Sequence, residues 1–231
     1  MQTGLTLSVT RDADAIRAAQ RLRHRVFVEE MGADPGDRAG LETDPHDGQS
    51  DHLILRDAAR PDLGVVATVR VRGGTHYTER EFDLSVLTAS GRTIAEAGRA
   101  CLHAEYRGGL AAMVLFKGLG VHLQQRGVDI AVGTASFPGA RIDAHLPALR
   151  RLQAEALAPA DLRPVARGSG AVAISGSAPK SAMIGVPALI KTYLRAGAFV
   201  GAGAYVDRAF NTVDVCMVLD MERLRLPERA G

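Results

Sequence analysis

Residues 93–125, TIAEAGRACLHAEYRGGLAAMVLFKGLGVHLQQ, decide the fold class. The mostly apolar residues 93–102 predict a central strand, and the apolar residues that follow Gly108 and Gly109 predict a helix that ends at Gly127. In a sheet built from such units, a ligand normally lies beyond the carboxyl end of the central strand, against the N-terminus of the helix. We therefore expect the chemistry near Arg99–Ala111.

The rest of the chain alternates strands and helices around this centre. Strands are predicted at residues 5–9, 52–57, 65–71, 129–135 and 213–219, and helices from Asp12 or Asp14 to Val26, at 146–157 and at 189–196. The Gly, Pro and Asp content of residues 31–50 excludes regular structure there. This pattern predicts an α/β fold, with a mixed central sheet flanked by helices, as a single domain over residues 1–231.

The composition excludes several classes of protein. With 231 residues, 46% of them hydrophobic and 23% charged, the chain has the material for one large core. The most apolar stretch, residues 183–206, contains Lys191 and Arg195 and does not predict a membrane span, and the start of the chain lacks the apolar block of a secretory signal. We expect a cytoplasmic protein. We expect no nucleic-acid partner, because aromatic residues make up 4% of the chain and no nucleic-acid-binding motif occurs.

Charged residues gather in two places that are candidates for a site. Between residues 29 and 51 the chain has eight acidic residues and one arginine, and Glu42, Asp44 and Asp47 are able to bind a metal ion or an amine. A solvated acidic loop is the alternative. Glu96 and Arg99 lie in the otherwise apolar central strand, where ionised groups need a partner. They form either a structural ion pair or a ligand site, and Gly98 between them is a natural position for a bulge that brings both to one face.

The residues that open the following helix offer a weaker signal. Backbone N–H groups from Tyr106 to Ala111 are able to cradle a phosphate. The order and spacing of His103, Ser136 and Asp143 do not indicate a nucleophile triad.

Taken together, these residues resemble a known set of motifs. The set comprises residues 22–30 (LRHRVFVEE), Glu42-x-Asp44-x-x-Asp47, Val69-Arg70 and Glu96-x-x-Arg99. It resembles the motifs shared by acyl-homoserine lactone synthases and ornithine N-acyltransferases. Segments that resemble the ornithine branch in particular are EFDLS at 81–85, GRACLH at 98–103, ASFPG at 135–139, and Ala202-Gly203-Ala204 with Asp207, Phe210-Asn211-Thr212 and Asp214.

Two departures help to place the chain within this resemblance. Homoserine lactone synthases have a Trp six residues after the Phe that corresponds to Phe27, and this position is Ala33 here. The difference favours the branch that acylates amino acids. The pyrophosphate-binding loop of acetyl-CoA-dependent relatives corresponds to Tyr106, Gly109 and Ala111, a weakened form that suits a pantetheine donor with one phosphate.

The resemblance implies a GNAT-type acyltransferase fold and a specific reaction. We expect transfer of a 3-hydroxyacyl chain from acyl carrier protein to the α-amine of ornithine or a similar amino acid, the first step of ornithine lipid synthesis. No metal or resident cofactor is implied, since the donor is the acyl-4′-phosphopantetheine of the carrier protein. The amphiphilic product is compatible with peripheral contact with the inner membrane. The alternatives are an acyl-homoserine lactone synthase that uses S-adenosylmethionine and a non-catalytic acyl-carrier-binding regulator.

The resemblance also assigns roles to individual residues. Glu96 is the expected general base, directly or through water, because an ammonium group cannot attack a thioester before it loses a proton. Arg70 and Arg99 either orient the acidic loop or hold the carboxylate of the amino acid. Backbone amides near Cys101–His103 are expected to hold the oxyanion. The full set is Glu96 and Arg99 as catalytic residues; Arg23, Phe27, Glu42, Asp44, Asp47 and Arg70 as acceptor-binding residues; and Cys101, Leu102, His103, Arg107, Gly109, Ala111, Ser136 and Phe137 as donor-binding residues.

Overall fold

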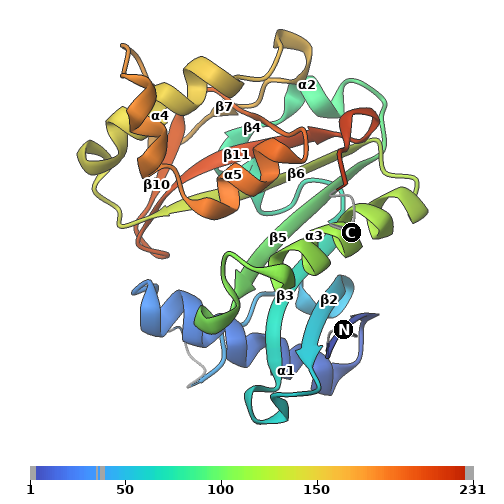
Figure 1. Ribbon diagram of the computed structural model, residues 1–231. Coiled ribbons are helices and arrows are strands. Elements are labelled where there is room, and N and C mark those ends of the chain that lie inside the picture. Colours follow the sequence, from blue (N-terminus) through green and yellow to red (C-terminus); the bar gives the residue numbers. More distant parts are fainter. Residues whose placement is uncertain (1–3, 35, 37–39, 227–231) are drawn as a thin grey trace. The chain divides into compact units, whose positions relative to one another are not determined.

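The computed structural model describes residues 4–34, 36 and 40–226 (Figure 1). Within this part the chain forms two compact units, which we describe separately. Unit 1 contains the described residues up to Arg72 together with Ala97–Gln125, and unit 2 contains Gly73–Glu96 and the described residues from Arg126 onward. The strand β5 (Ile94–Leu102) therefore contributes its first residues to unit 2 and its last residues to unit 1. The single domain expected over residues 1–231 stays a prediction.

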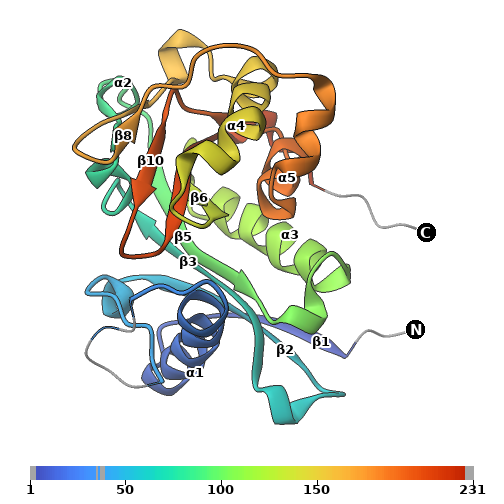
Figure 2. The ribbon, with the colours of Figure 1, turned by 90° about the vertical axis from the view of Figure 1, so that its left-hand side faces the viewer.

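Unit 1 is a sheet with a helix on each face. Its strands follow the order β1 (Leu5–Thr10), β2 (Asp51–Asp57), β3 (Val65–Gly73) and β5, and β1, β2 and β3 pair antiparallel. The helix α1 (Ala13–Arg23) packs on the side of Ile54, and α3 (Leu110–Gln125) packs on the side of Leu7 and Leu53 (Figure 2). These elements confirm the strands, hairpin and helices predicted for this part of the sequence.

The sequence of α1 explains both its start and its orientation. The Asp12 carboxylate accepts hydrogen bonds from the N–H groups of Asp14 and Ala15 at 3.1 and 2.9 Å, which caps the helix. Ile16, Ala19 and Leu22 recur on one face, and all three are buried. The chain then continues as a π-helical turn, His24–Glu30, whose residue Val26 is buried in the same core.

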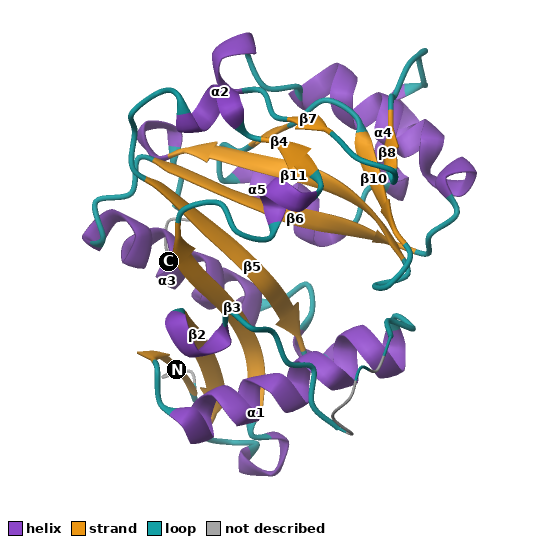
Figure 3. Cartoon of the chain, turned by 180° about the vertical axis from the view of Figure 1, so that it is seen from behind, coloured by secondary structure: helices purple, strands orange, loops and turns teal. Residues whose placement is uncertain are grey.

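Unit 2 is built on a second set of strands. β5 pairs in parallel with β6 (Ile130–Pro138) over Ile94–Glu96, and β6 pairs antiparallel with β11 (Thr212–Asp220) along its whole length. β10 (Ala204–Asp207), β8 (Ala171–Val172) and β9 (Phe199–Val200) complete this sheet. The short strands β4 (Phe82–Asp83) and β7 (Val165–Ala166) form a small second sheet (Figure 3).

Both faces of the β6–β11 ladder are covered. On one face Phe137, Val213 and Val215 pack against α4 (Ile142–Ala156) and α5 (Ala188–Arg195). On the other, Cys216 and Val218 pack against apolar residues of β4 and of α2 (Ser85–Thr88). Successive residues of a strand point to opposite faces. Val213 and Val215 of β11 therefore enter one core, and Cys216 and Val218 enter the other.

Two sequence predictions need adjustment in unit 2. The helix predicted at 146–157 begins four residues earlier, at Ile142, so that Pro147 lies inside α4 and not in its first turn. The strands β7 to β10 were not predicted, because runs of two to four residues carry no periodic signal. No helix of the described residues is long and apolar enough to cross a membrane.

Candidate active site

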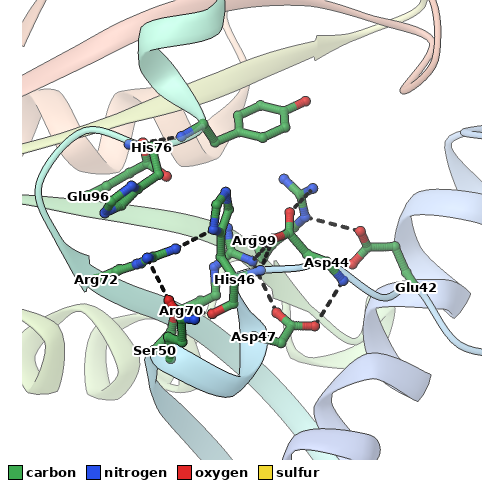
Figure 4. A network of polar contacts seen from close by, with 12 residues as sticks. Glu42, Asp44, His46, Asp47, Ser50, Arg70, Arg72, His76, Glu96 and Arg99 are labelled. Atoms are coloured by element: carbon green, nitrogen blue, oxygen red, sulfur yellow. Dashed lines mark hydrogen bonds and ion pairs between the residues drawn. The ribbon is translucent and has the colours of Figure 1, made fainter.

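The sheet arginines of unit 1 contact the acidic loop that precedes β2. Arg70, on β3, places Nη1 at 2.8 Å from Asp44 Oδ1 and at 3.0 Å from Asp47 Oδ1 (Figure 4). Arg99, on β5, places Nε at 3.1 Å from Glu42 Oε1 and Nη2 at 2.8 Å from Asp44 Oδ2. Of the two roles predicted for these arginines, the structure therefore shows contact with the loop.

Arg23, the last residue of α1, completes the network. Its side chain is 1% exposed and contacts Glu42 through Nε, while Nη1 lies 2.8 Å from Asp47 Oδ1. Gln20, one helical turn earlier, donates a further hydrogen bond to Asp47 Oδ2 at 2.8 Å. Each of the three loop carboxylates now contacts two arginines, and each arginine contacts two carboxylates. Such a closed ring of ion pairs balances the charge of the loop within unit 1.

The electrostatics of the loop follow from this pairing. Burial alone would raise the pKa of Asp47, but its hydrogen bonds and charge interaction with Arg23, together with Gln20 and Arg70, hold that pKa well below its ordinary value of 3.8. Burial likewise opposes ionisation of Asp44, and the charges of Arg99 and Arg70 more than offset it, so the pKa of Asp44 is also lowered. Both carboxylates are ionised at neutral pH. A cationic ligand at this loop would compete with arginines that already contact it.

Arg99 has an unusual backbone conformation. Its φ of 54° lies in the left-handed region, which costs a non-glycine residue about 1–2 kcal/mol. The break in strand geometry expected at Gly98 thus lies one residue later. The ion pairs of Arg99 with Glu42 and Asp44 hold the side chain in the position that this backbone gives it.

Glu96 is anchored within unit 2. Its Oε2 accepts three backbone hydrogen bonds, from the N–H groups of His76, Tyr77 and Thr78 at 3.0, 2.8 and 2.8 Å. The residue is 4% exposed. No described residue donates a hydrogen bond to Oε1. The carboxylate therefore has one oxygen that fixes its orientation and one that is able to receive a proton.

The end of β5 carries the predicted donor-binding residues. The N–H of His103 donates to the carbonyl of Val66 at 2.8 Å, so this amide does not serve an oxyanion. The expectation for the three amides from Cys101 to His103 is corrected in this respect, and Cys101 and Leu102 remain as candidates. Burial raises the pKa of the Cys101 thiol to about 12, which excludes a thiolate at neutral pH.

The other predicted residues of unit 1 lie near the turn before α3, except for Phe27. Arg107 contacts Glu30 and donates from Nε to the carbonyl of Leu102 at 3.1 Å. Gly109 immediately precedes α3, and Ala111 is buried in its first turn. Phe27 lies on the π-helical turn and packs against the core beneath α1.

Ser136 and Phe137, on β6 in unit 2, differ in their surroundings. Phe137 is 1% exposed and belongs to the core against α4 and α5, whereas Ser136 is half-buried and lies opposite Asp214 of β11. Asp214 belongs to a group that the sequence reasoning did not assign to the site. The carboxylate oxygens of Glu81, Asp207 and Asp214 lie within 4.8 Å of one another, and all three residues are buried. Their signal in the sequence was their presence in the motif segments around residues 81 and 207–214.

Comparison with known proteins identifies the fold. The acetyltransferase (GNAT) domain family matches residues 22–117, which include Arg23, the acidic loop and Glu96. A solved CoA-dependent acyl-homoserine lactone synthase superposes with a TM-score of 0.54 at 15% identity, over 90% of this chain and 76% of that one. The fold is therefore that of the GNAT acyltransferases, as the sequence predicted.

Two curated relatives define the family more narrowly. The L-ornithine N(α)-acyltransferase of Rhodobacter capsulatus is 42% identical over 94% of this chain and 90% of its own length. The L-ornithine N(α)-acyltransferase of Agrobacterium fabrum is 34% identical over 95% of this chain and 82% of its own length. The chain is an acyltransferase of the GNAT class. It belongs to the L-ornithine N(α)-acyltransferase family.

Proposed function

We propose that this enzyme transfers an acyl chain from a thioester to the α-amine of L-ornithine. The observation that carries the proposal is the similarity over nearly the whole chain to relatives named for this reaction. In the reaction a C–N bond forms at the thioester carbonyl, the C–S bond breaks, and the thiol leaves. The ammonium group must lose one proton before its nitrogen can attack, and the same nitrogen loses a second proton after the attack. The base returns one of these protons to the departing thiolate.

Glu96 is the proposed base. Three backbone N–H groups hold Oε2, so Oε1 is the oxygen that would take the proton, directly or through one water. The amides of Cys101 and Leu102 are the proposed donors to the oxyanion. Arg99 is proposed to act on the acceptor side, because its side chain is held by the acidic loop.

The closed network of arginines and carboxylates has a proposed positioning role. Arg23, Arg70 and the loop carboxylates Glu42, Asp44 and Asp47 contact one another inside unit 1. They are proposed to keep the acceptor-side loop in one conformation, and Phe27 packs on the same core. A pre-organised loop lowers the entropy cost of holding an amino acid in reactive geometry.

The proposed donor is a 3-hydroxyacyl group on acyl carrier protein, with no cofactor resident on the enzyme. The turn at Arg107 and Gly109, with Ala111 in the first turn of α3, would receive the single phosphate of the pantetheine arm. Ser136 is proposed to lie along the donor, whereas its neighbour Phe137 belongs to the core beneath it. Because the product would be an amphiphile, we also propose peripheral contact with the inner membrane, which sedimentation with anionic and neutral vesicles would test.

The direct test is a product assay. Purified enzyme is incubated with 3-hydroxyacyl carrier protein and L-ornithine, and the N-acyl product is measured by mass spectrometry. Parallel reactions replace the carrier protein by acyl-CoA and ornithine by S-adenosylmethionine. We expect product with ornithine and the carrier protein; a lactone from S-adenosylmethionine would instead support a signal synthase, and no product with any pair would support a non-catalytic regulator.

Glu96→Gln tests the base. The amide retains an oxygen for the three backbone donors, so the fold is kept while the proton acceptor is lost. We expect kcat to fall by about 10²- to 10⁴-fold. Glu222→Gln, at an exposed position of unit 2, is the matched control and should keep full activity. Turnover of Glu96→Gln equal to that of this control would remove Glu96 from the mechanism.

A further inference from the structure

A long stretch of unit 2 carries only positive charge. Residues 163–206 contain no aspartate or glutamate, and their cations are Arg163, Arg167, Lys180, Lys191 and Arg195. At the chain's average of 26 acidic residues in 231, about five would be expected in a stretch of this length. Lys180, Lys191 and Arg195 belong to two consecutive elements, the 3₁₀ helix Lys180–Gly185 and α5. This part of unit 2 therefore favours a partner with negative charge.

One apolar side chain stands out in this cationic segment. Ile184, in the 3₁₀ helix, is 82% exposed, whereas the other exposed large apolar side chains of the described residues are 37–50% exposed. Singly exposed apolar side chains are common at protein surfaces, so exposure by itself indicates no partner. Ile184 differs from the others in combining this exposure with an anchored backbone and neighbouring cations.

The backbone that carries Ile184 is anchored on both sides. Val186 is buried, and Met183 packs against the same core, which α4 and α5 share. The N–H of Val186 donates to the carbonyl of Met183 at 3.2 Å. A Cβ at Gly185 would lie 3.4 Å from the Cβ of Ala148, so the segment is in contact with α4. Because its neighbours on both sides pack inward, Ile184 is the apolar side chain of this helix that stays in solvent.

Positive charge lies beside this side chain. Lys191, on α5, donates from Nζ to the carbonyl of Ile184 at 3.2 Å. Arg195 follows Lys191 by four residues, so the two lie on the same face of α5. Lys180 is exposed and precedes Ile184 by four residues of a 3₁₀ helix, about 8 Å along the axis. An exposed apolar side chain among cations matches an anionic bilayer, where the apolar group enters the acyl boundary and the cations contact the phosphates.

We propose that Ile184, Lys180, Lys191 and Arg195, which we call the Ile184 surface, dock the enzyme on an anionic lipid bilayer. This inference assigns residues to the peripheral contact proposed above, and it rests on the proposed function because an N-acylated product is an amphiphile that partitions into lipid. An acidic protein would need a pocket for Ile184 in order to gain from its burial. The acyl boundary of a bilayer receives the side chain without one, so the bilayer is the favoured partner.

Ile184→Trp tests insertion directly, because the chain has no tryptophan of its own. Its fluorescence is recorded with vesicles of phosphatidylglycerol and phosphatidylcholine and with vesicles of phosphatidylcholine alone. We expect the emission to shift to shorter wavelength with the anionic vesicles only. Val9→Trp, at an exposed position of unit 1, is the matched control and should keep its emission. The absence of a shift in Ile184→Trp, or an equal shift in both variants, would overturn the inference.

Sedimentation with the same vesicles tests the individual residues. Each cation near an anionic surface contributes about fivefold to binding, so we expect Lys180→Gln combined with Lys191→Gln to weaken vesicle binding by about 10- to 30-fold. Ile184→Ser should weaken it by about 3- to 10-fold. Arg21→Gln combined with Arg56→Gln removes the same charge from exposed positions of unit 1 and is the matched control. Equal losses in the two double variants would show attraction by net charge alone and would overturn the inference.

The vesicle measurements need no turnover, so they distinguish the possible failures. If Ile184→Trp shifts with anionic vesicles but wild type makes no N-acyl ornithine, the proposed function fails and the Ile184 surface stands. If wild type makes the product but the emission of Ile184→Trp does not change with vesicles, the surface fails and the function stands. A shift caused by acyl carrier protein and not by vesicles would show a protein-docking surface and would also overturn the inference.

Discussion

Replacement of Arg23 by Met should destabilise the protein strongly. The guanidinium is 1% exposed and contacts both Glu42 and Asp47, and its Nη2 also donates to the carbonyl of Glu42 at 2.9 Å. Without it, two buried carboxylates each retain one arginine, Arg99 and Arg70 respectively. Removal of one partner of a buried ion pair typically costs about 3–5 kcal/mol, and we expect a loss within that range.

Urea unfolding followed by circular dichroism measures this loss. Arg21→Met, on the same helix but exposed, is the matched control and should change the free energy of unfolding by less than about 0.5 kcal/mol. A double-mutant cycle with Asp47→Asn should give a coupling energy of about 1–3 kcal/mol. A loss below about 1 kcal/mol in Arg23→Met, at an unchanged m-value, would refute the view that the ion-pair network holds the loop.

Further predictions concern acid stability, packing and thiol chemistry. Because the pKa of Asp47 is held below 3.8 in the native protein, the unfolded chain binds more protons than the native one in acid. The stabilisation from Asp47 is therefore complete above about pH 4–5 and is lost as the pH falls below that range. Asp47→Asn should make the free energy of unfolding depend less on pH, which unfolding at a series of pH values measures. Gly118→Ala should lower stability by about 1–3 kcal/mol in urea unfolding, because a Cβ there would lie 1.9 Å from Leu7 Cδ2. The thiol of Cys101 should react with Ellman's reagent at pH 8 only after unfolding, since burial raises its pKa to about 12; rapid reaction of the native protein would contradict this.

Much of the fold could be predicted from local sequence patterns. The cap at Asp12 and the apolar face of Ile16 and Leu22 are complete within a few residues, so α1 could be located without tertiary information. The hairpin of β2 and β3 was equally visible because its turn and both strands are adjacent in sequence. The short strands around β10 lacked such signals, because their hydrogen bonds to distant strands, not their own residues, define them.

The residues of the site could be predicted from the sequence, but the contacts among them could not. Sequence placed Asp44, Asp47 and Arg99 in the motif set, yet it could not show that arginines from three separate elements would contact the loop carboxylates. Glu81 and Asp214 stand more than 130 residues apart in the chain. Their proximity depends on the packing of unit 2, and nothing in the local pattern of either residue indicates the other.

The division of β5 between the units matters for folding while the chain is being made on the ribosome. All described residues of unit 1 have been made once Gln125 has been added, whereas most of unit 2 is still untranslated. The first unit is thus able to fold at a stage when Ile94–Glu96 still lacks β6, the strand with which it pairs in parallel from Ile130 onward. A truncated product that ends near residue 125 would therefore expose the unpaired edge of Ile94–Glu96, a feature that promotes aggregation and recruits chaperones.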